Sequence, residues 1–219
     1  MLLFTEHIDE PLQLVSEAVG GQKKLHLEGI FMQADIRNRN KRVYPKTVLE
    51  EAVSAYNSGY VAKGRAVGEL NHPDGPRVNL DKVSHLITKL EWSGSNVMGK
   101  AMILENMPMG LMAKNLIEGG VQLGVSSRGV GNMDKSSGSM TKFIATAVDI
   151  VHDPSAPETF VNGVMEGVDY IITEDGAIAE NQHRVIEDIK RTIHKTPRRI
   201  IKETQEKLFE EYIRSLTIK

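Results

Sequence analysis

The chain has 219 residues, of which 40% are hydrophobic and 26% charged, a composition typical of a globular domain and unlike that of disordered or fibrous proteins. The absence of cysteine excludes a disulfide scaffold, a thiol nucleophile, a Cys-ligated zinc site and an iron–sulfur cluster. No apolar run approaches the roughly 18 residues of a membrane-spanning helix, and Glu6, Asp9 and Glu10 lie where a signal peptide carries positive charge. We therefore expect neither a membrane segment nor export.

The net charge of −2 conceals an uneven distribution along the chain. Residues 181–219 contain ten Lys and Arg against six Asp and Glu, a net charge of +4, which leaves −6 on residues 1–180. The basic residues of this tail are interleaved with Ile and Leu at helical spacing, and aromatic residues are few. This pattern favours a basic amphipathic helix that packs on protein over a segment that binds nucleic acid. We expect the tail to follow a loosely structured, glycine-punctuated linker over residues 164–180.

The first quarter of the chain predicts a strand and a helix behind an N-terminal arm. Residues 1–22 form a short amphipathic lead that ends near two glycines, and we expect an arm outside the core. Residues 24–36 alternate apolar and polar side chains with a change of parity at Gly29, which predicts a bulged strand. Residues 45–56 begin with Pro45 and repeat apolar side chains at helical spacing, which predicts a helix of about three turns.

Later segments predict further strands and a second helix. Their apolar runs end at clusters of Gly, Pro, Asn and Ser, which is typical of strands joined by turns. The turn over residues 93–96 indicates a hairpin, and residues 108–118 predict a helix stopped by two glycines. With 19 Gly, 8 Pro and 5% aromatic residues, the chain favours an α+β fold over a helical bundle. The expected strands cover residues 65–70, 83–92, 97–104, 121–131 and 142–151.

Three segments place polar side chains at the end or in the middle of apolar runs. A serine hydroxyl becomes nucleophilic when an imidazole takes its proton, and a third group must orient that imidazole. His72 follows a strand and precedes Pro73, which keeps its backbone extended. Asp149 stands inside an apolar run, where a carboxylate costs several kcal/mol unless it is paired, so it requires a fixed partner. The segments are Gly68-Glu69-Leu70-Asn71-His72-Pro73, Gly124-Val125-Ser126-Ser127-Arg128-Gly129 and Ala145-Thr146-Ala147-Val148-Asp149-Ile150-Val151.

Each of these side chains also has an ordinary structural explanation when it is taken alone. A histidine such as His72 is commonly a loop or capping residue. Ser126 and Ser127 are explained equally well as the polar edge of a strand. The partner that Asp149 requires is explained as half of a structural ion pair.

Five blocks of sequence, spread over residues 25–160, carry a stronger signal than any single side chain. They are Leu27-Glu28-Gly29-Ile30-Phe31-Met32-Gln33-Ala34, Asn38-Arg39-Asn40-Lys41-Arg42-Val43-Tyr44-Pro45, Gly68-Glu69-Leu70-Asn71-His72-Pro73, Gly124-Val125-Ser126-Ser127-Arg128-Gly129, and Val148-Asp149 with Pro154-Ser155-Ala156-Pro157. In this order they resemble the prohead core serine proteases of T4-like tailed bacteriophages. The N-terminal arm and the residues after about 163 carry little of the resemblance.

The resemblance implies a serine endopeptidase of capsid maturation, related to herpesvirus assemblins. The implied fold is a compact, mainly antiparallel β-barrel flanked by helices, which we place over residues 23–163. The implied substrates are scaffold or core proteins and the major capsid protein, inside the prohead in the cytoplasm of the bacterial host. We expect no cofactor and no metal, and the sequence leaves a homo-oligomer open.

Within the matching blocks, the resemblance implies His72 as the general base and Ser126 as the nucleophile. We expect Asp149 to be the third member of the site. The looser Ser-x-Gly pattern of related phage proteases would instead place the nucleophile at Ser127. The third member in assemblins is a histidine, which makes His152 the alternative to Asp149.

Two further groups are expected to stabilise the oxyanion of the attacked carbonyl. They are Arg128 and the backbone N–H groups around Gly129, which follow the nucleophile in the sequence.

The resemblance also implies cleavage after a glutamate that has Leu or Ile two residues before it. A glutamate side chain entering a partly dry pocket needs a cationic or multi-donor partner. The densest basic loop contains Arg37, Arg39, Lys41 and Arg42, although a solvated loop explains these charges equally well. We expect self-cleavage after Glu180, or alternatively after Glu174, which would release the basic helical tail 181–219.

Two competing functions differ in class from a serine protease. A metallohydrolase built on His72, His85 or His152 is disfavoured because the sequence lacks a His-Glu-x-x-His helix and any tight ligand spacing. A non-catalytic scaffold or core protein is the stronger alternative, because Gly- and Ser-rich loops and a charged amphipathic tail also suit an interaction protein.

Overall fold

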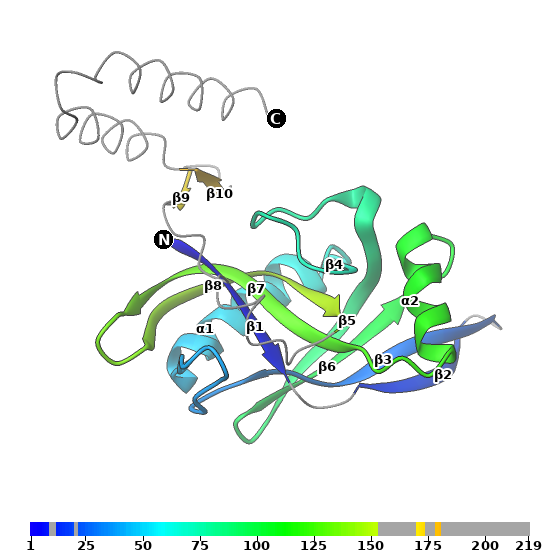
Figure 1. Cartoon of the computed structure of the whole chain (residues 1–219), viewed down its shortest axis with the longest axis horizontal. Helices are drawn as coiled ribbons and strands as arrows, with labels where there is room; N and C mark the ends of the chain where they lie inside the picture. Colours follow the sequence, from blue (N-terminus) through cyan, green and yellow to red (C-terminus); the bar gives the residue numbers. More distant parts are fainter. Residues whose placement is uncertain (9–11, 20–21, 153–169, 174–177, 181–219) are drawn as a thin grey trace, which may run out of the picture. The chain divides into compact units, whose positions relative to one another are not determined.

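The structure is a computed structural model that describes residues 1–8, 12–19, 22–152, 170–173 and 178–180 (Figure 1). The chain divides into two compact units, Met1–Gly167 and Val168–Lys219. The described part of the first unit contains two antiparallel sheets and two α-helices, and the described part of the second unit is a short strand pair. No helix in the described ranges has both the length and the apolar character needed to cross a membrane.

The larger sheet has five antiparallel strands in the order β2-β3-β6-β5-β4. The predicted hairpin is confirmed: β5 and β6 are joined by a tight turn in which Gly94 has a φ of +63°. The bulge predicted at Gly29 is present in β3, but it lies just after that residue, between Ile30 and Met32. The strands are β2 (Gln13–Val19), β3 (Gln22–Gln33), β4 (Val67–Glu69), β5 (Val83–Ser93) and β6 (Asn96–Ile103).

The smaller sheet contains β1 (Leu2–Ile8), β7 (Gly124–Asp134) and β8 (Ser139–Val151), in the order β1-β7-β8. Its first strand corrects the expectation of an arm outside the core. β1 pairs with β7 along its whole length (Figure 1). Leu3 and Phe4 of β1 are buried. Burial of these apolar side chains against a strand more than a hundred residues away favours the sheet over a solvated arm.

Both predicted helices are present: α1 (Lys46–Tyr56) and α2 (Pro108–Glu118). The α1 helix lies against β8 and buries Leu49, Val53 and Tyr56, the apolar stripe that its spacing predicts. It continues into a π-helical turn, Asn57–Val61, and a 3₁₀ turn, Leu80–Lys82, precedes β5. The α2 helix lies against β5 and β6, where Ala113 is buried.

The main hydrophobic core includes side chains from both sheets and from α1, among them Phe4, Phe31, Leu49 and Val148. The expected closed barrel is wrong: the two sheets remain separate. β4 has only three residues, and its end meets β8 through an isolated bridge between Leu70 and Ile150 instead of a continuous ladder. The two sheets therefore meet at this edge through a single bridge, and the hydrogen-bonded ladder does not close into a cylinder.

The described part of the second unit lies in the segment expected to be a linker. There β9 (Tyr170–Ile172) and β10 (Ile178–Glu180) form an antiparallel pair. The expected helical tail, residues 181–219, and the expected boundary near residue 163 lie outside the described residues.

Candidate active site

The candidate nucleophile lies in the central strand of the smaller sheet. Ser126 of β7 pairs with Asp149 of β8 on one side and with His7 of β1 on the other. Ser126 is fully buried, and Ser127 is nearly so. The chain's own N-terminal strand therefore runs directly beside both candidate serines.

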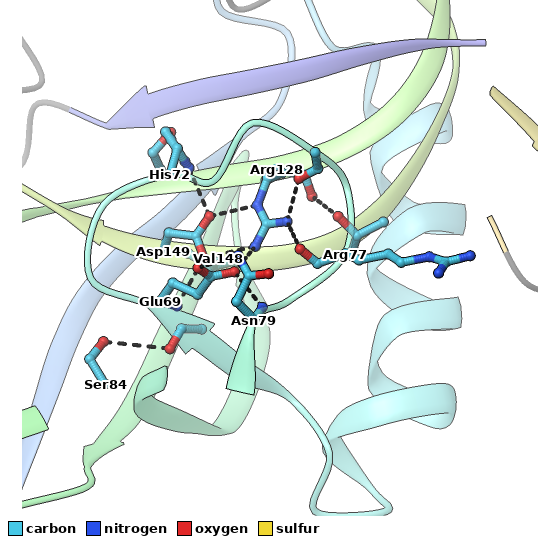
Figure 2. A network of polar contacts seen from close by, with 12 residues as sticks. Glu69, His72, Arg77, Asn79, Ser84, Arg128, Val148 and Asp149 are labelled. Carbon is cyan, nitrogen blue, oxygen red and sulfur yellow. Dashed lines mark hydrogen bonds and ion pairs between the residues drawn. The ribbon is translucent and has the colours of Figure 1, made fainter. Parts of the chain in front are cut away.

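A serine, a histidine and a carboxylate form a continuous chain of contacts at this point. Nε2 of His72 lies 2.7 Å from Oγ of Ser126, and Nδ1 of the same ring lies 2.7 Å from Oδ2 of Asp149. Figure 2 shows the His72 ring beside the Asp149 carboxylate. With Nδ1–H donating to the carboxylate, Nε2 is left as the acceptor for the serine proton, which is the arrangement that general-base catalysis requires.

The backbone before His72 is fixed to the strand that carries Asp149. Asn71 adopts a left-handed conformation with a φ of +67°, and its N–H donates to the carbonyl of Ile150 over 2.8 Å. Non-glycine residues adopt this conformation infrequently, and Asn is among those that tolerate it best. The turn at the end of β4 therefore directs His72 toward β7 and β8.

The Asp149 carboxylate is buried and accepts hydrogen bonds from three residues, Glu69, His72 and Arg128. The backbone N–H of Glu69 donates to Oδ1 over 3.0 Å, and Nε of Arg128 donates to Oδ2 over 2.8 Å. Burial alone would raise the pKa of Asp149, but the hydrogen bonds from His72 and Arg128 and the charge of Arg128 outweigh it and hold the pKa at about 2. Asp149 is thus ionised at neutral pH, as a group that orients an imidazole must be.

Arg128 occupies the centre of the network (Figure 2). Its guanidinium is fully buried. Nη2 donates to Oδ1 of Asp149 over 3.2 Å and to Oε1 of Glu69 over 3.3 Å. Nη1 donates to the carbonyls of Gly75 and Arg77 over 2.8 and 2.9 Å. Together with Nε–H, all five guanidinium hydrogens have acceptors.

These contacts correct the expectation that Arg128 donates to the oxyanion, because its side chain has no N–H left for a substrate. Gly129 lies within the central strand, paired with Phe4 on one side and with Ala145 on the other, and the register with β8 shifts between Arg128 and Gly129. A role of the backbone N–H groups around Gly129 at the oxyanion stays a prediction.

The two alternative site residues lie apart from this chain of contacts. Ser127 follows Ser126 in a regular strand and so directs its side chain to the opposite face of the sheet. His152 is exposed just beyond the end of β8, and within the described ranges no hydrogen bond joins it to His72. The geometry brings together Ser126, His72 and Asp149 instead.

A second buried histidine supports the strand that carries Asp149. His85 accepts at Nδ1 from the Ser84 hydroxyl over 2.9 Å and donates from Nε2 to the carbonyl of Val148, also over 2.9 Å. Burial lowers the pKa of His85, which keeps the ring neutral and suited to one donor and one acceptor. In the part of the chain that the structure describes, no group of three or more His, Asp or Glu side chains could hold a metal ion.

Sequence reasoning did not identify Glu69 as part of the network. Its buried carboxylate pairs with Arg128 and accepts from the backbone N–H of Asn79 over 2.9 Å, which ties down the loop after His72 (Figure 2). The sequence feature that could have predicted its role is the position of Glu69 at the end of an apolar strand, where a carboxylate needs a partner as Asp149 does.

The four cations of the basic loop differ in burial. Arg42 is buried, while Arg37, Arg39 and Lys41 are exposed. Glu180 pairs with Tyr170 at the end of β10, and Glu174 lies outside the described residues.

Comparison with known proteins identifies the family to which the chain belongs. The profile of a family described as prohead core protein serine protease matches residues 11–169. The prohead core protein protease of Enterobacteria phage T4 is 41% identical over 152 residues, which cover 65% of this chain and 70% of the relative. The solved structure of the bacteriophage T4 capsid assembly protease has a TM-score of 0.64 and 36% sequence identity, and the match covers 69% of this chain and 98% of that one. By sequence and by fold, this chain belongs to the prohead core protein serine protease family.

Proposed function

We propose that this protein is a serine endopeptidase that cleaves scaffold or core proteins and capsid protein inside a bacteriophage prohead during head maturation. The observation that carries the proposal is the continuous contact from Ser126 through His72 to Asp149, at 2.7 Å for each step. The names of the T4 relatives, a prohead core protein protease and a capsid assembly protease, support the setting.

In this proposal each residue has one role in acyl transfer. His72 removes the Ser126 proton as Oγ attacks the scissile carbonyl, and it later returns that proton to the leaving amine. Asp149 holds the imidazole in the tautomer with hydrogen on Nδ1 and stabilises the imidazolium that forms. Water then attacks the acyl-enzyme, with His72 again as the base, and regenerates the serine.

Arg128 and Glu69 act as positioning residues. Arg128 fixes Asp149 through two hydrogen bonds, and the same guanidinium holds the loop after His72 through two backbone carbonyls. A displacement of about 1 Å in such a site costs roughly a hundredfold in rate, so this shared anchor couples the positions of the base and of its orienting group.

A substrate must also reach a buried nucleophile. Ser126 has no exposed surface, and β1 is paired with β7 beside it. We propose that β1 is displaced when an extended substrate binds. Cleavage then follows a glutamate that has Leu or Ile two residues before it.

Labelling with a fluorophosphonate, combined with cleavage of a core-protein substrate, tests the catalytic assignment. The wild type should be labelled at one serine, and Ser126→Ala should lose labelling and lower the rate of cleavage by about 10⁴-fold or more. His72→Ala should lose a similar amount and Asp149→Asn somewhat less, while Ser127→Ala serves as the control in the same strand. Full activity in Ser126→Ala with loss in Ser127→Ala would move the nucleophile to Ser127. A wild type that is neither labelled nor active would favour a scaffold or core protein instead.

Self-cleavage after Glu180, with Glu174 as the alternative, is a separate part of the proposal. Cleavage at Glu180 would divide the acidic body from the basic tail at the point where the composition changes. Intact-mass measurement of incubated wild type and of Ser126→Ala tests it. Loss of residues 181–219 from the wild type alone is expected. An unchanged wild-type mass, under conditions where added substrate is cut, would refute cleavage at this site.

A further inference from the structure

A second polar cluster surrounds the buried carboxylate of Glu6 in β1. Oε1 of Glu6 contacts Nη1 of Arg42 in an ion pair and accepts from the Tyr44 hydroxyl over 3.0 Å. Oε2 accepts from the side-chain amides of Asn38 and Asn40, the latter over 3.1 Å. Four donors thus converge on one carboxylate that lies outside the network around Asp149.

All four donors come from one short stretch of chain, whereas their acceptor comes from another. The stretch is organised by its own hydrogen bonds: Oδ1 of Asn38 accepts from the Arg42 N–H over 2.9 Å, and the Asn38 N–H donates to the Arg42 carbonyl over 2.9 Å. Burial raises the pKa of Tyr44 well above its usual range, so its hydroxyl remains a donor. The backbone that carries the donors is therefore held by hydrogen bonds of its own, which do not involve Glu6.

The register of β1 relates these four donors to the candidate nucleophile. Glu6 pairs with Ser127 and His7 pairs with Ser126, so the peptide bond that follows Glu6 lies beside the Ser126–Ser127 step of β7. An extended peptide in the place of β1 would put an acidic side chain among the four donors. The next peptide bond of that peptide would lie at Ser126.

The side chain two residues before Glu6 also supports the comparison of β1 with an extended substrate peptide. Phe4 is fully buried in the main core, and the Arg42 guanidinium carbon lies 4.9 Å from the centre of its ring. In an extended strand, residues two apart face the same side. β1 thus presents an apolar residue, one intervening residue and a glutamate, which resembles the pattern proposed above for substrates but has Phe4 in place of Leu or Ile.

We infer that Asn38, Asn40, Arg42 and Tyr44 form the pocket that binds the glutamate side chain directly before the scissile bond, and that Glu6 occupies this pocket in the present structure. The inference rests on the proposed protease function and names the residues that select its substrates. The ligand class is an extended peptide with a carboxylate side chain. The alternative is that the Glu6–Arg42 pair only holds β1 in the sheet.

The test measures kcat/KM of the full chain for two peptides that differ only in having Glu or Gln before the cleaved bond, with Ile two residues earlier in both. Arg42→Gln should reduce the Glu:Gln preference of the wild type at least about tenfold, because a charge-assisted contact is lost. Tyr44→Phe, which removes one neutral donor, should reduce it a few-fold. Lys41→Gln is the matched control: it removes an exposed cation from the same loop and should leave the preference unchanged.

Glu6→Gln separates the pocket from a structural ion pair. This change weakens the binding of residue 6 to the four donors but leaves the donors themselves intact. The kcat/KM for the Glu peptide should therefore rise, while the Glu:Gln preference stays the same. Circular dichroism checks folding, and if Arg42→Gln does not fold, Tyr44→Phe and Asn40→Ala decide the matter.

Two failures are distinguishable in this experiment. An unchanged preference in folded pocket variants, with an active wild type, would overturn the pocket and leave the protease function standing. A wild type that cuts neither peptide and is not labelled by fluorophosphonate would overturn the protease function and the pocket with it.

Discussion

At the scale of single residues, Arg128 explains why the candidate active site can hold two buried carboxylates. Asp149 and Glu69 are both fully buried, and one guanidinium contacts both of them while it also binds two backbone carbonyls. A planar fork with five donors satisfies this set of acceptors, and an ammonium group with three donors cannot. The guanidinium group therefore has a structural role at this position, and its planar shape matters as much as its positive charge.

We predict that Arg128→Lys lowers the free energy of unfolding by at least about 2 kcal/mol and slows fluorophosphonate labelling of Ser126. The loss arises because buried acceptors are left unpaired although the charge is kept. Urea denaturation and the labelling rate are the measurements, with Lys142→Arg on the exposed side of β8 as the control. Wild-type stability in Arg128→Lys would contradict the proposed role of the five donors.

Asp149 gives a prediction about pH. Its pKa is about 2 in the folded protein against an ordinary value of 3.8, so folding favours the ionised form. The resulting stabilisation, on the order of 2 kcal/mol, is complete above the unfolded pKa and is lost as the pH falls from about 4 through 2. Asp149→Asn should lack it.

Urea denaturation of both proteins between pH 7 and pH 2 measures this effect. The difference in unfolding free energy between wild type and Asp149→Asn should be largest at neutral pH and should shrink below pH 4. Parallel stability curves over the whole range would show that the charge of Asp149 contributes nothing to folding.

At the scale of elements, the close approach of β4 to β8 positions the site. A Cβ built on Gly68 would lie 2.1 Å from the carbonyl oxygen of Val148 and 2.4 Å from the His85 ring. Only a residue without a side chain lets these strands come this near. That proximity allows Glu69 and Asn71 to hydrogen-bond to Asp149 and Ile150.

We predict that Gly68→Ala destabilises the protein by about 1–3 kcal/mol or more and weakens peptidase activity, because the added methyl group forces β4 away from β8. Thermal denaturation and substrate cleavage measure the two effects. Gly59→Ala is the matched control, since a Cβ there meets no atom within 4 Å and the residue lies in a helical turn. Equal stability of the two variants would show that β4 can shift without cost.

At the scale of the whole molecule, both described hydrophobic clusters belong to the first unit. Both hydrophobic clusters consist of residues between 2 and 150, and the residues of the candidate site lie in the same range. Such a unit contains its own core and should fold independently.

We therefore predict that a chain ending at Gly167 folds and unfolds cooperatively with a midpoint close to that of the full chain. Urea denaturation followed by tryptophan fluorescence reports this directly, because Trp92 lies in β5 of the first unit. A broad transition or a midpoint well below that of the full chain would show that residues 168–219 are needed for the stability of the first unit.

The sequence by itself determined the elements with strong local patterns. β5, β6, β8 and both helices follow from apolar spacing and from turn residues, which act within a few positions of each other. It also identified Ser126, His72 and Asp149 as candidate site residues. A carboxylate in an apolar run needs a partner, and polar side chains at the ends of apolar runs are not explained by packing alone. The family resemblance rested on the same local blocks.

Only the tertiary structure decided which of these groups meet. The contacts of His72 with Ser126 and with Asp149 depend on the strand faces and on the turn that brings His72 to β7 and β8. The pairing of β1 with β7 depends on the register between two segments about a hundred residues apart. The open sheets and the enclosure of Glu6 depend on contacts across the core. Burial energies and buried charge pairs that act between distant segments set that register, and no local pattern in the chain encodes them.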